Sequence, residues 1–139
     1  MAVSDSIAKT KSLDHLVLTV RDLDATIKFY TEVMGMQVET FSSGGESRFA
    51  LKFGSSKINL HVHRKEFEPK AQNVMPGSAD LCFLVETDVN DVLKGLKDRG
   101  IDVLEDSRVV ERTGAQGKIN SVYCRDPDGN LIEYRSPFT

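Results

Sequence analysis

The sequence predicts an α+β fold made of two tandem βαβββ modules that together form a curved mixed sheet. Apolar residues alternate at strand period in most of the chain and recur at helical spacing in two stretches. The order of one strand, one helix and three strands occurs twice, and a shift of 65 residues places Leu16 on Leu81 and Gly35 on Gly100. An internal repeat of this kind predicts two copies of one supersecondary unit, and 139 residues suit a single domain.

The first predicted module spans residues 13–63. Its opening strand, over 13–20, is apolar and β-branched and carries His15 near its start. Asp22 is a good N-cap for an amphipathic helix over 22–34, and Gly35 is a natural residue to end it. Three further strands are expected over 36–43, 47–54 and 57–63.

Residues 64–78 contain two prolines and no periodic pattern, so they predict a loop between the modules. The second module then spans 79–137, with strands at 79–85, 101–105, 119–124 and 130–134 and a helix that Thr87 or Asp88 begins and Gly100 ends. Its later strands require a shift of 72 residues, so about seven extra residues are expected within 107–118, together with the Gly-rich loop TGAQGK.

Composition excludes several classes of protein. Residues 1–12 are polar and predict a flexible leader rather than a signal peptide. No apolar run approaches the roughly 18 residues that a membrane span needs, and a net charge of −3 argues against a nucleic-acid partner. Cys82 and Cys124 lie in apolar strands, which predicts reduced thiols and a cytoplasmic protein.

The repeat also predicts a metal site. The same register places His15 on Asp80 and His61 on Glu133, so each module offers two potential ligands at equivalent positions. Equivalent positions in duplicated modules lie around a pseudo-twofold axis, where two imidazoles and two carboxylates are able to converge. Such a set suits one divalent ion, namely Zn²⁺, Ni²⁺, Fe²⁺, Co²⁺ or Mn²⁺.

Each ligand has an alternative interpretation. Asn59 and His63 share a strand face with His61, so any of the three is able to serve as the ligand of that strand. Asp80 also fits an ordinary residue at the start of a strand, which would leave three protein ligands and open positions for water. A histidine that begins a strand, or a glutamate within one, is often only a solvated side chain.

Four segments resemble the vicinal oxygen chelate superfamily, the fold of glyoxalase I, bleomycin-resistance proteins and extradiol dioxygenases. They are LDHLVLTVRDLDATIKFYTEVMGM, KINLHV, GSADLCFLV and RDPDGNLIEY, which span nearly all of residues 13–137. The likeness is strongest to small glyoxalase-domain-containing proteins of a virulence-associated, uncharacterised group. It implies that each module forms half of a cup around a metal, and that modules of small members pair across a homodimer.

The resemblance carries over to individual residues. His15 matches the first-strand ligand and Glu133 the last-strand carboxylate, whereas Asp80 stands where glyoxalase I has His or Glu and is shorter than Glu by one methylene. It implies a metal-dependent lyase or isomerase of the glyoxalase I type, acting on a small substrate such as a glutathione adduct that chelates the metal through vicinal oxygens.

Within this expected activity, Glu133 is the candidate general base. Arg112 and Lys118 flank the Gly-rich loop and are the candidate substrate-binding residues. Two alternatives share the fold. One is a metal-free protein that sequesters a ligand, like a bleomycin-resistance protein. The other is a dioxygenase or thiol transferase, and a dioxygenase would use His15, His61 and Glu133.

Overall fold

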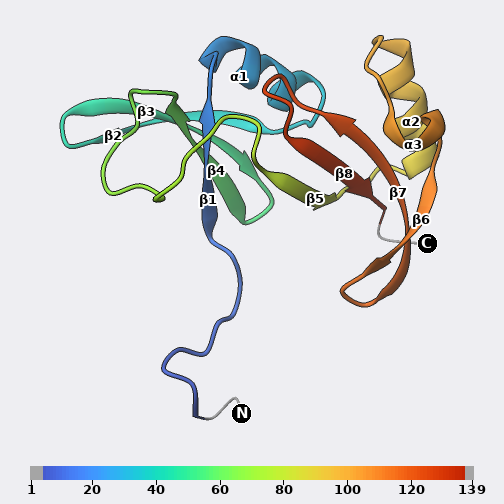
Figure 1. Cartoon of the computed structure of the whole chain (residues 1–139), viewed down its shortest axis with the longest axis horizontal. Helices are drawn as coiled ribbons and strands as arrows, with labels where there is room; N and C mark the ends of the chain where they lie inside the picture. Colours follow the sequence, from blue (N-terminus) through green and yellow to red (C-terminus); the bar gives the residue numbers. More distant parts are fainter. Residues whose placement is uncertain (1–4, 137–139) are drawn as a thin grey trace.

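The computed structural model describes residues 5–136, which form two four-stranded sheets with helices (Figure 1). Residues 1–4 of the predicted leader and Pro137 of the predicted second module lie outside this range. Within it, no helix is both long and apolar enough to cross a membrane. The first module contains β1 (His15–Val20), α1 (Leu23–Glu32), β2 (Gln37–Ser43), β3 (Glu46–Phe53) and β4 (Ser56–Val62). The second contains β5 (Asp80–Leu84), α2 (Val89–Asp98), α3 (Leu104–Ser107), β6 (Val110–Gly114), β7 (Gly117–Arg125) and β8 (Leu131–Arg135).

The two sheets have the same topology. Their strand orders are β1-β4-β3-β2 and β5-β8-β7-β6, and in each the first strand runs parallel to the last while the other pairs are antiparallel. This equivalence confirms the predicted α+β fold of two βαβββ modules.

Each sheet has a core face and an open face because side chains alternate along a strand. On β1, Leu18 and Val20 point into the core, whereas His15 lies on the opposite side. One hydrophobic core runs through both modules and includes Tyr30 of α1 and Leu96 of α2. Both helices lie on one side of the molecule, and the leader leaves from the other side (Figure 1). We call the sheet faces away from the core the open faces.

The ends of the two long helices follow the sequence signals. The carboxylate of Asp22 accepts a hydrogen bond from the backbone N–H of Ala25 at 3.0 Å, and Asp88, one of the two predicted caps, does the same for Asn90 at 2.8 Å. Gly35 and Gly100 adopt φ values of 71° and 72° just after the helices. Glycine reaches this left-handed region without strain, so both predicted helix ends are confirmed.

The predicted strand at 101–105 is wrong. Residues 101–103 form no strand, and α3 follows directly, with Glu105 and Asp106 at φ values of 55° and 61°. The alternation of Ile-Asp-Val-Leu-Glu resembles a strand because Val103 is buried in the core, but no neighbouring strand pairs with it. Residues 99–109 link α2 to β6, whereas only residues 33–36 link α1 to β2. Much of the extra length of the second module therefore lies before residues 107–118, the segment in which it was predicted. The Gly-rich loop is a tight β6–β7 turn at residues 115–116.

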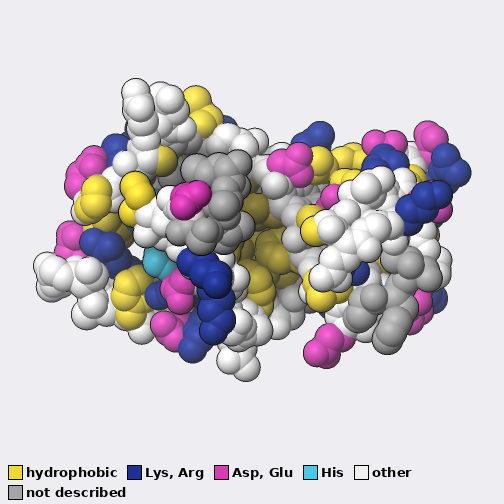
Figure 2. All heavy atoms as spheres, turned by 90° about the horizontal axis from the view of Figure 1, so that it is seen from below, with side chains coloured by type: hydrophobic (Ala, Val, Ile, Leu, Met, Phe, Trp, Pro, Cys, Tyr) yellow, Lys and Arg dark blue, Asp and Glu magenta, His cyan; other side chains and the backbone are white. Residues whose placement is uncertain are grey.

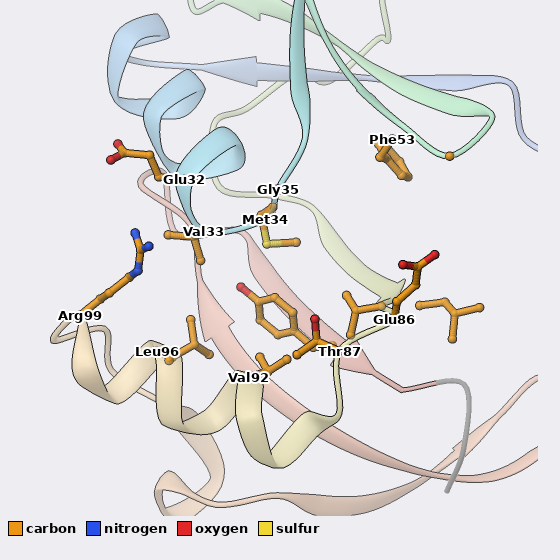
Figure 3. A pocket seen from close by; sticks show the side chains of 15 residues that line it. Glu32, Val33, Met34, Gly35, Phe53, Glu86, Thr87, Val92, Leu96 and Arg99 are labelled. Carbon is orange, nitrogen blue, oxygen red and sulfur yellow. The ribbon is translucent and has the colours of Figure 1, made fainter.

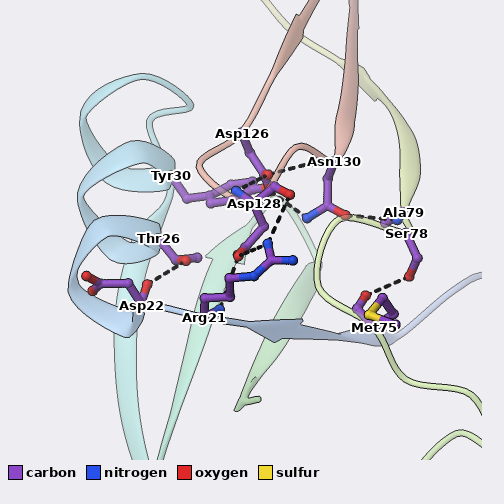
Figure 4. A network of polar contacts seen from close by, with 10 residues as sticks. All are labelled: Arg21, Asp22, Thr26, Tyr30, Met75, Ser78, Ala79, Asp126, Asp128 and Asn130. Atoms are coloured by element: carbon purple, nitrogen blue, oxygen red, sulfur yellow. Dashed lines mark hydrogen bonds and ion pairs between the residues drawn. The ribbon is translucent and has the colours of Figure 1, made fainter.

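A buried polar network joins the β7–β8 turn to α1 and β5 (Figure 4). The carboxylate of Asp126 accepts hydrogen bonds from the Tyr30 hydroxyl at 2.7 Å, the Asn130 amide at 2.8 Å and the backbone N–H groups of Asp128 and Asn130. Asn130 in turn accepts from the backbone N–H of Ala79 at 2.8 Å. The turn therefore fixes the start of β5 relative to the first module.

The loop that leads into β5 approaches this turn closely. A Cβ at Gly77 would collide with the carbonyl oxygen of Asp128, and Gly77 has a φ of 82°. On the other side of the turn, Arg21 donates its backbone N–H to the Asp128 carboxylate at 3.1 Å. Only glycine fits at position 77, because both the close approach and the left-handed backbone exclude a side chain.

Candidate metal and substrate site

The first module presents His15 and His61 on its open face. His15 begins β1, and its Nδ1 lies 2.9 Å from the carboxylate of Asp14. When Nδ1–H is donated to this carboxylate, the lone pair of Nε2 is available, an arrangement typical of histidines that bind metals. His61 lies opposite Thr19 in the parallel β1–β4 pair, four residues further along the sheet than His15. Both histidines line a pocket of about 470 Å³.

Strand pairing corrects the predicted equivalence of His61 and Glu133. Asn59 lies opposite Val17, two residues after His15, and Glu133 lies opposite Cys82, two residues after Asp80. Asn59 therefore occupies the position that corresponds to Glu133, which was one of the open alternatives. The predicted shift failed because the β3–β4 turn contains residues 54–55, whereas the β7–β8 turn contains residues 126–130. That His61 binds a metal stays a prediction.

The side chain of His61 is buried, with charged residues of both signs nearby. His61 is only 6% exposed, and its ring packs edge-on against Phe67 of the inter-module loop, with 5.4 Å between ring centroids. The Arg48 guanidinium stacks on the same Phe67 ring, 3.8 Å from its centroid. Burial first, and the Arg48 charge second, lower the pKa of His61, so its imidazole is neutral at pH 7.

The second module presents Glu133 on its open face. Ser121 donates its hydroxyl to the Glu133 carboxylate at 2.6 Å, while Tyr123 and Cys82 are its neighbours on the two adjacent strands. Asp80 and Glu133 line one pocket of about 310 Å³. Burial and the carboxylate of Glu133 raise the pKa of Tyr123, so its phenol remains a hydrogen-bond donor at neutral pH.

The two predicted substrate-binding residues lie on different faces of the second sheet. Arg112 lines the Glu133 pocket, with its guanidinium 3.3 Å from the Glu105 carboxylate and 5.5 Å from the Tyr123 ring centroid. Lys118 neighbours Ile119 on β7 and so points to the opposite side, where its amine lies 3.6 Å from Glu111. Of these two residues, only Arg112 lines the same pocket as Glu133 within one chain.

The four predicted ligands do not form one metal site within a single chain. Among residues 5–136, no group of three or more His, Cys, Asp or Glu side chains could hold a metal ion. His15 and His61 line one pocket, and Asp80 and Glu133 line the other. The residue types match a borderline divalent ion, but each sheet supplies only a half-site.

The surface shows the same division. Figure 2 views the molecule from the side on which the leader leaves. A histidine side chain lies beside Lys, Arg and acidic side chains on the half that holds the first module, and an apolar hollow separates this half from the second module.

A separate cleft of about 720 Å³ opens between the end of α1 and α2 (Figure 3). Its walls mix apolar and polar side chains: Val33 and Met34 lie on one side and Val92 and Leu96 on the other, together with Glu32, Glu86 and Arg99. None of the six predicted site residues lines it.

Sequence inspection missed two residues that hold the predicted site residues in place. Ser121 holds Glu133, and Phe67 holds both Arg48 and His61. Ser121 alternates in phase with Tyr123 on a strand that pairs with the Glu133 strand, so a correct hairpin register would have found it. Phe67 lies in a loop without period, and the sequence contains no signal for its contacts.

Cys82 provides a test of the electrostatics around Glu133. Burial, and then the Glu133 carboxylate, raise the pKa of the Cys82 thiol to about 11. Because the thiolate is the nucleophile, we expect alkylation by iodoacetamide at pH 8 to be roughly tenfold slower than for an ordinary exposed thiol, since the smaller thiolate fraction is partly offset by the higher nucleophilicity of a more basic thiolate. Glu133→Gln should speed the reaction several-fold by removing the negative charge. Cys124, which is fully buried, serves as the internal control and should stay unmodified in the folded protein. A rate that Glu133→Gln leaves unchanged would contradict the coupling.

The fold corresponds to a known class of proteins. Residues 12–134 match the Glyoxalase/Bleomycin resistance protein/Dioxygenase superfamily, and the chain belongs to this family. It is 55% identical over 121 residues to a protein named Virulence protein STM3117 from Salmonella typhimurium, covering 87% of this chain and 81% of that protein.

Two further similarities bear on fold and function. A solved structure from the mobile metagenome of V. Pseudocholerae superposes with a TM-score of 0.88 at 51% identity, covering 96% of this chain and 100% of that one. A Lactoylglutathione lyase from Schizosaccharomyces pombe is 38% identical over 149 residues, covering 89% of this chain and 47% of that protein.

Proposed function

We propose that the protein is a metal-dependent lyase or isomerase of the glyoxalase I type, acting on a small substrate with vicinal oxygens. The observation that carries this proposal is the pair of half-sites at equivalent places on two equivalent sheets. His15 stands on the first open face, and Asp80 and Glu133 stand on the second. Membership of the family and the similarity to a lactoylglutathione lyase support the same reaction class.

We further propose that two copies of the chain complete the site as a homodimer. One copy would supply the open face of its first module and the other that of its second module, so that His15 meets Asp80 and Glu133. In a twofold-symmetric dimer this pairing occurs twice and leaves no half-site unused. His61 or Asn59 would supply the remaining ligand.

The residues of this chain have distinct roles in the proposed reaction. A bound divalent ion would act as a Lewis acid on the vicinal oxygens of the substrate. Glu133 is the candidate general base for the carbon next to the carbonyl, and the hydrogen bond from Ser121 fixes one of its oxygens. Arg112, whose guanidinium lies near Tyr123 and Glu105, would contact an anionic part of the substrate, such as the carboxylate of a glutathione adduct.

Metal content is the first test. We expect protein purified without chelator to carry about one divalent ion per chain, and added Zn²⁺, Ni²⁺, Mn²⁺ or Fe²⁺ to raise the thermal midpoint of metal-free protein. The metal-replete protein should convert the hemithioacetal of methylglyoxal and glutathione. Metal binding without this activity would favour a dioxygenase or thiol transferase. If no divalent ion binds, the lyase proposal fails and a metal-free ligand-sequestering protein becomes the better interpretation.

A further inference from the structure

The pocket on the open face of the first module contains buried polar atoms that no other described residue satisfies. His61 Nδ1, Arg48 Nε and Asn59 Oδ1 have no hydrogen-bond partner among residues 5–136. A buried polar group without a partner destabilises the folded protein, because it has lost its hydrogen bonds to water. All three residues line the same pocket of about 470 Å³, so a ligand in this pocket would satisfy them together.

The charge of the pocket selects an anion. His15, Arg48 and Lys70 line it, and no acidic residue is among the described residues that do. Lys70 is balanced by the carboxylates of Glu66 and Glu68, at 4.0 Å and 3.6 Å. Arg48 makes no ion pair with a carboxylate in the described part of the chain, although it is half-buried. A half-buried guanidinium without a counter-charge favours binding of an oxyanion.

The donors are held in place before a ligand arrives. Phe67 packs against both the guanidinium of Arg48 and the ring of His61, so neither side chain has to be ordered on binding. The His61 ring carries at least one N–H donor in either protonation state. Asn59 Oδ1 is an acceptor, and an ionised carboxylate, which only accepts, cannot satisfy it. A hydroxyl group next to the anionic group of the ligand supplies the missing donor.

We propose that this pocket binds a small hydroxylated oxyanion, with Arg48 and His61 on the carboxylate or phosphate group and Asn59 accepting from a neighbouring hydroxyl. This inference rests on the proposed function, because it names the substrate class of the same composite site. It places the main anion contact on Arg48 of the first module, in addition to Arg112 of the second.

The test is calorimetric titration of metal-free protein with lactate and, separately, with glycerol phosphate, at constant ionic strength in chloride. Saturable binding of lactate assigns a carboxylate and that of glycerol phosphate a phosphate. We expect Arg48→Gln to weaken binding at least about tenfold, because a charge-assisted contact is lost. Lys52→Gln is the matched control: it removes the same charge from the same strand, but Lys52 is paired with Glu39 at 3.3 Å and should leave affinity unchanged.

Propionate, which lacks the hydroxyl of lactate, should bind several-fold more weakly, and Asn59→Leu should abolish this difference. The thermal midpoints of Arg48→Gln and Lys52→Gln, measured without ligand, should both lie well above the titration temperature, which separates binding from folding. The proposal is overturned if neither anion binds saturably, or if both charge variants lose affinity equally. Because the titration uses neither metal nor turnover, its failure can be distinguished from a failure of the lyase proposal.

Discussion

Mixing two variants that each bind no metal, His15→Ala and Glu133→Ala, is expected to restore about a quarter of the wild-type metal content. This follows if the site is shared between two copies of the chain. Random exchange makes about half of the dimers mixed, and each mixed dimer combines the intact first module of one chain with the intact second module of the other. Its second site carries both substitutions and stays empty. The measurement is the amount of bound metal per chain after subunit exchange.

The result separates two arrangements that share the same ligands. If all ligands came from one chain, every chain in the mixture would carry a defective site and mixing would restore nothing. The matched control is a mixture of His15→Ala with Asp80→Ala, which should behave like the first mixture if Asp80 is a ligand. If Asp80→Ala alone still binds metal fully, Asp80 is not a ligand, and water would complete the coordination by the remaining side chains.

The duplicated fold could be predicted because the repeat is expressed in apolar periodicity, which depends only on which face of each element is buried. The helix boundaries could be predicted because Asp22, Asp88, Gly35 and Gly100 act locally, through hydrogen bonds and φ values within a few residues. The open-face positions of His15 and Glu133 follow from the same alternation.

The fine register of the site could not be predicted in this way. Which residue of β4 corresponds to Glu133 depends on how many residues each turn contains. In general, each residue added to a turn moves the side chains after it to the other face of the sheet. The strand predicted at 101–105 failed for a related reason: burial of Val103 mimics a strand, but strand formation also needs a partner. The contacts of Phe67 are long-range, and no local pattern records them.

Asp126→Ala is expected to destabilise the protein by about 3–5 kcal/mol, the largest effect on folding among the residues discussed. Its carboxylate is 6% exposed and accepts four hydrogen bonds, so removal leaves the Tyr30 hydroxyl and the Asn130 amide buried without an acceptor. Burial, and then the Asp126 charge, raise the pKa of Tyr30, so this hydroxyl remains a donor across the neutral and mildly alkaline range. Urea unfolding followed by circular dichroism measures the change.

Asp22→Ala is the matched control because Asp22 also accepts a backbone hydrogen bond, but at an exposed helix start. Loss of that cap should destabilise by only about 1 kcal/mol. Asp126→Asn should fall between the two, since the amide keeps one oxygen acceptor but places an N–H₂ group against existing donors. Equal effects of Asp126→Ala and Asp22→Ala would show that the turn network does not fix the two modules against each other. In that case the relative placement of the two open faces would depend on the shared hydrophobic core alone.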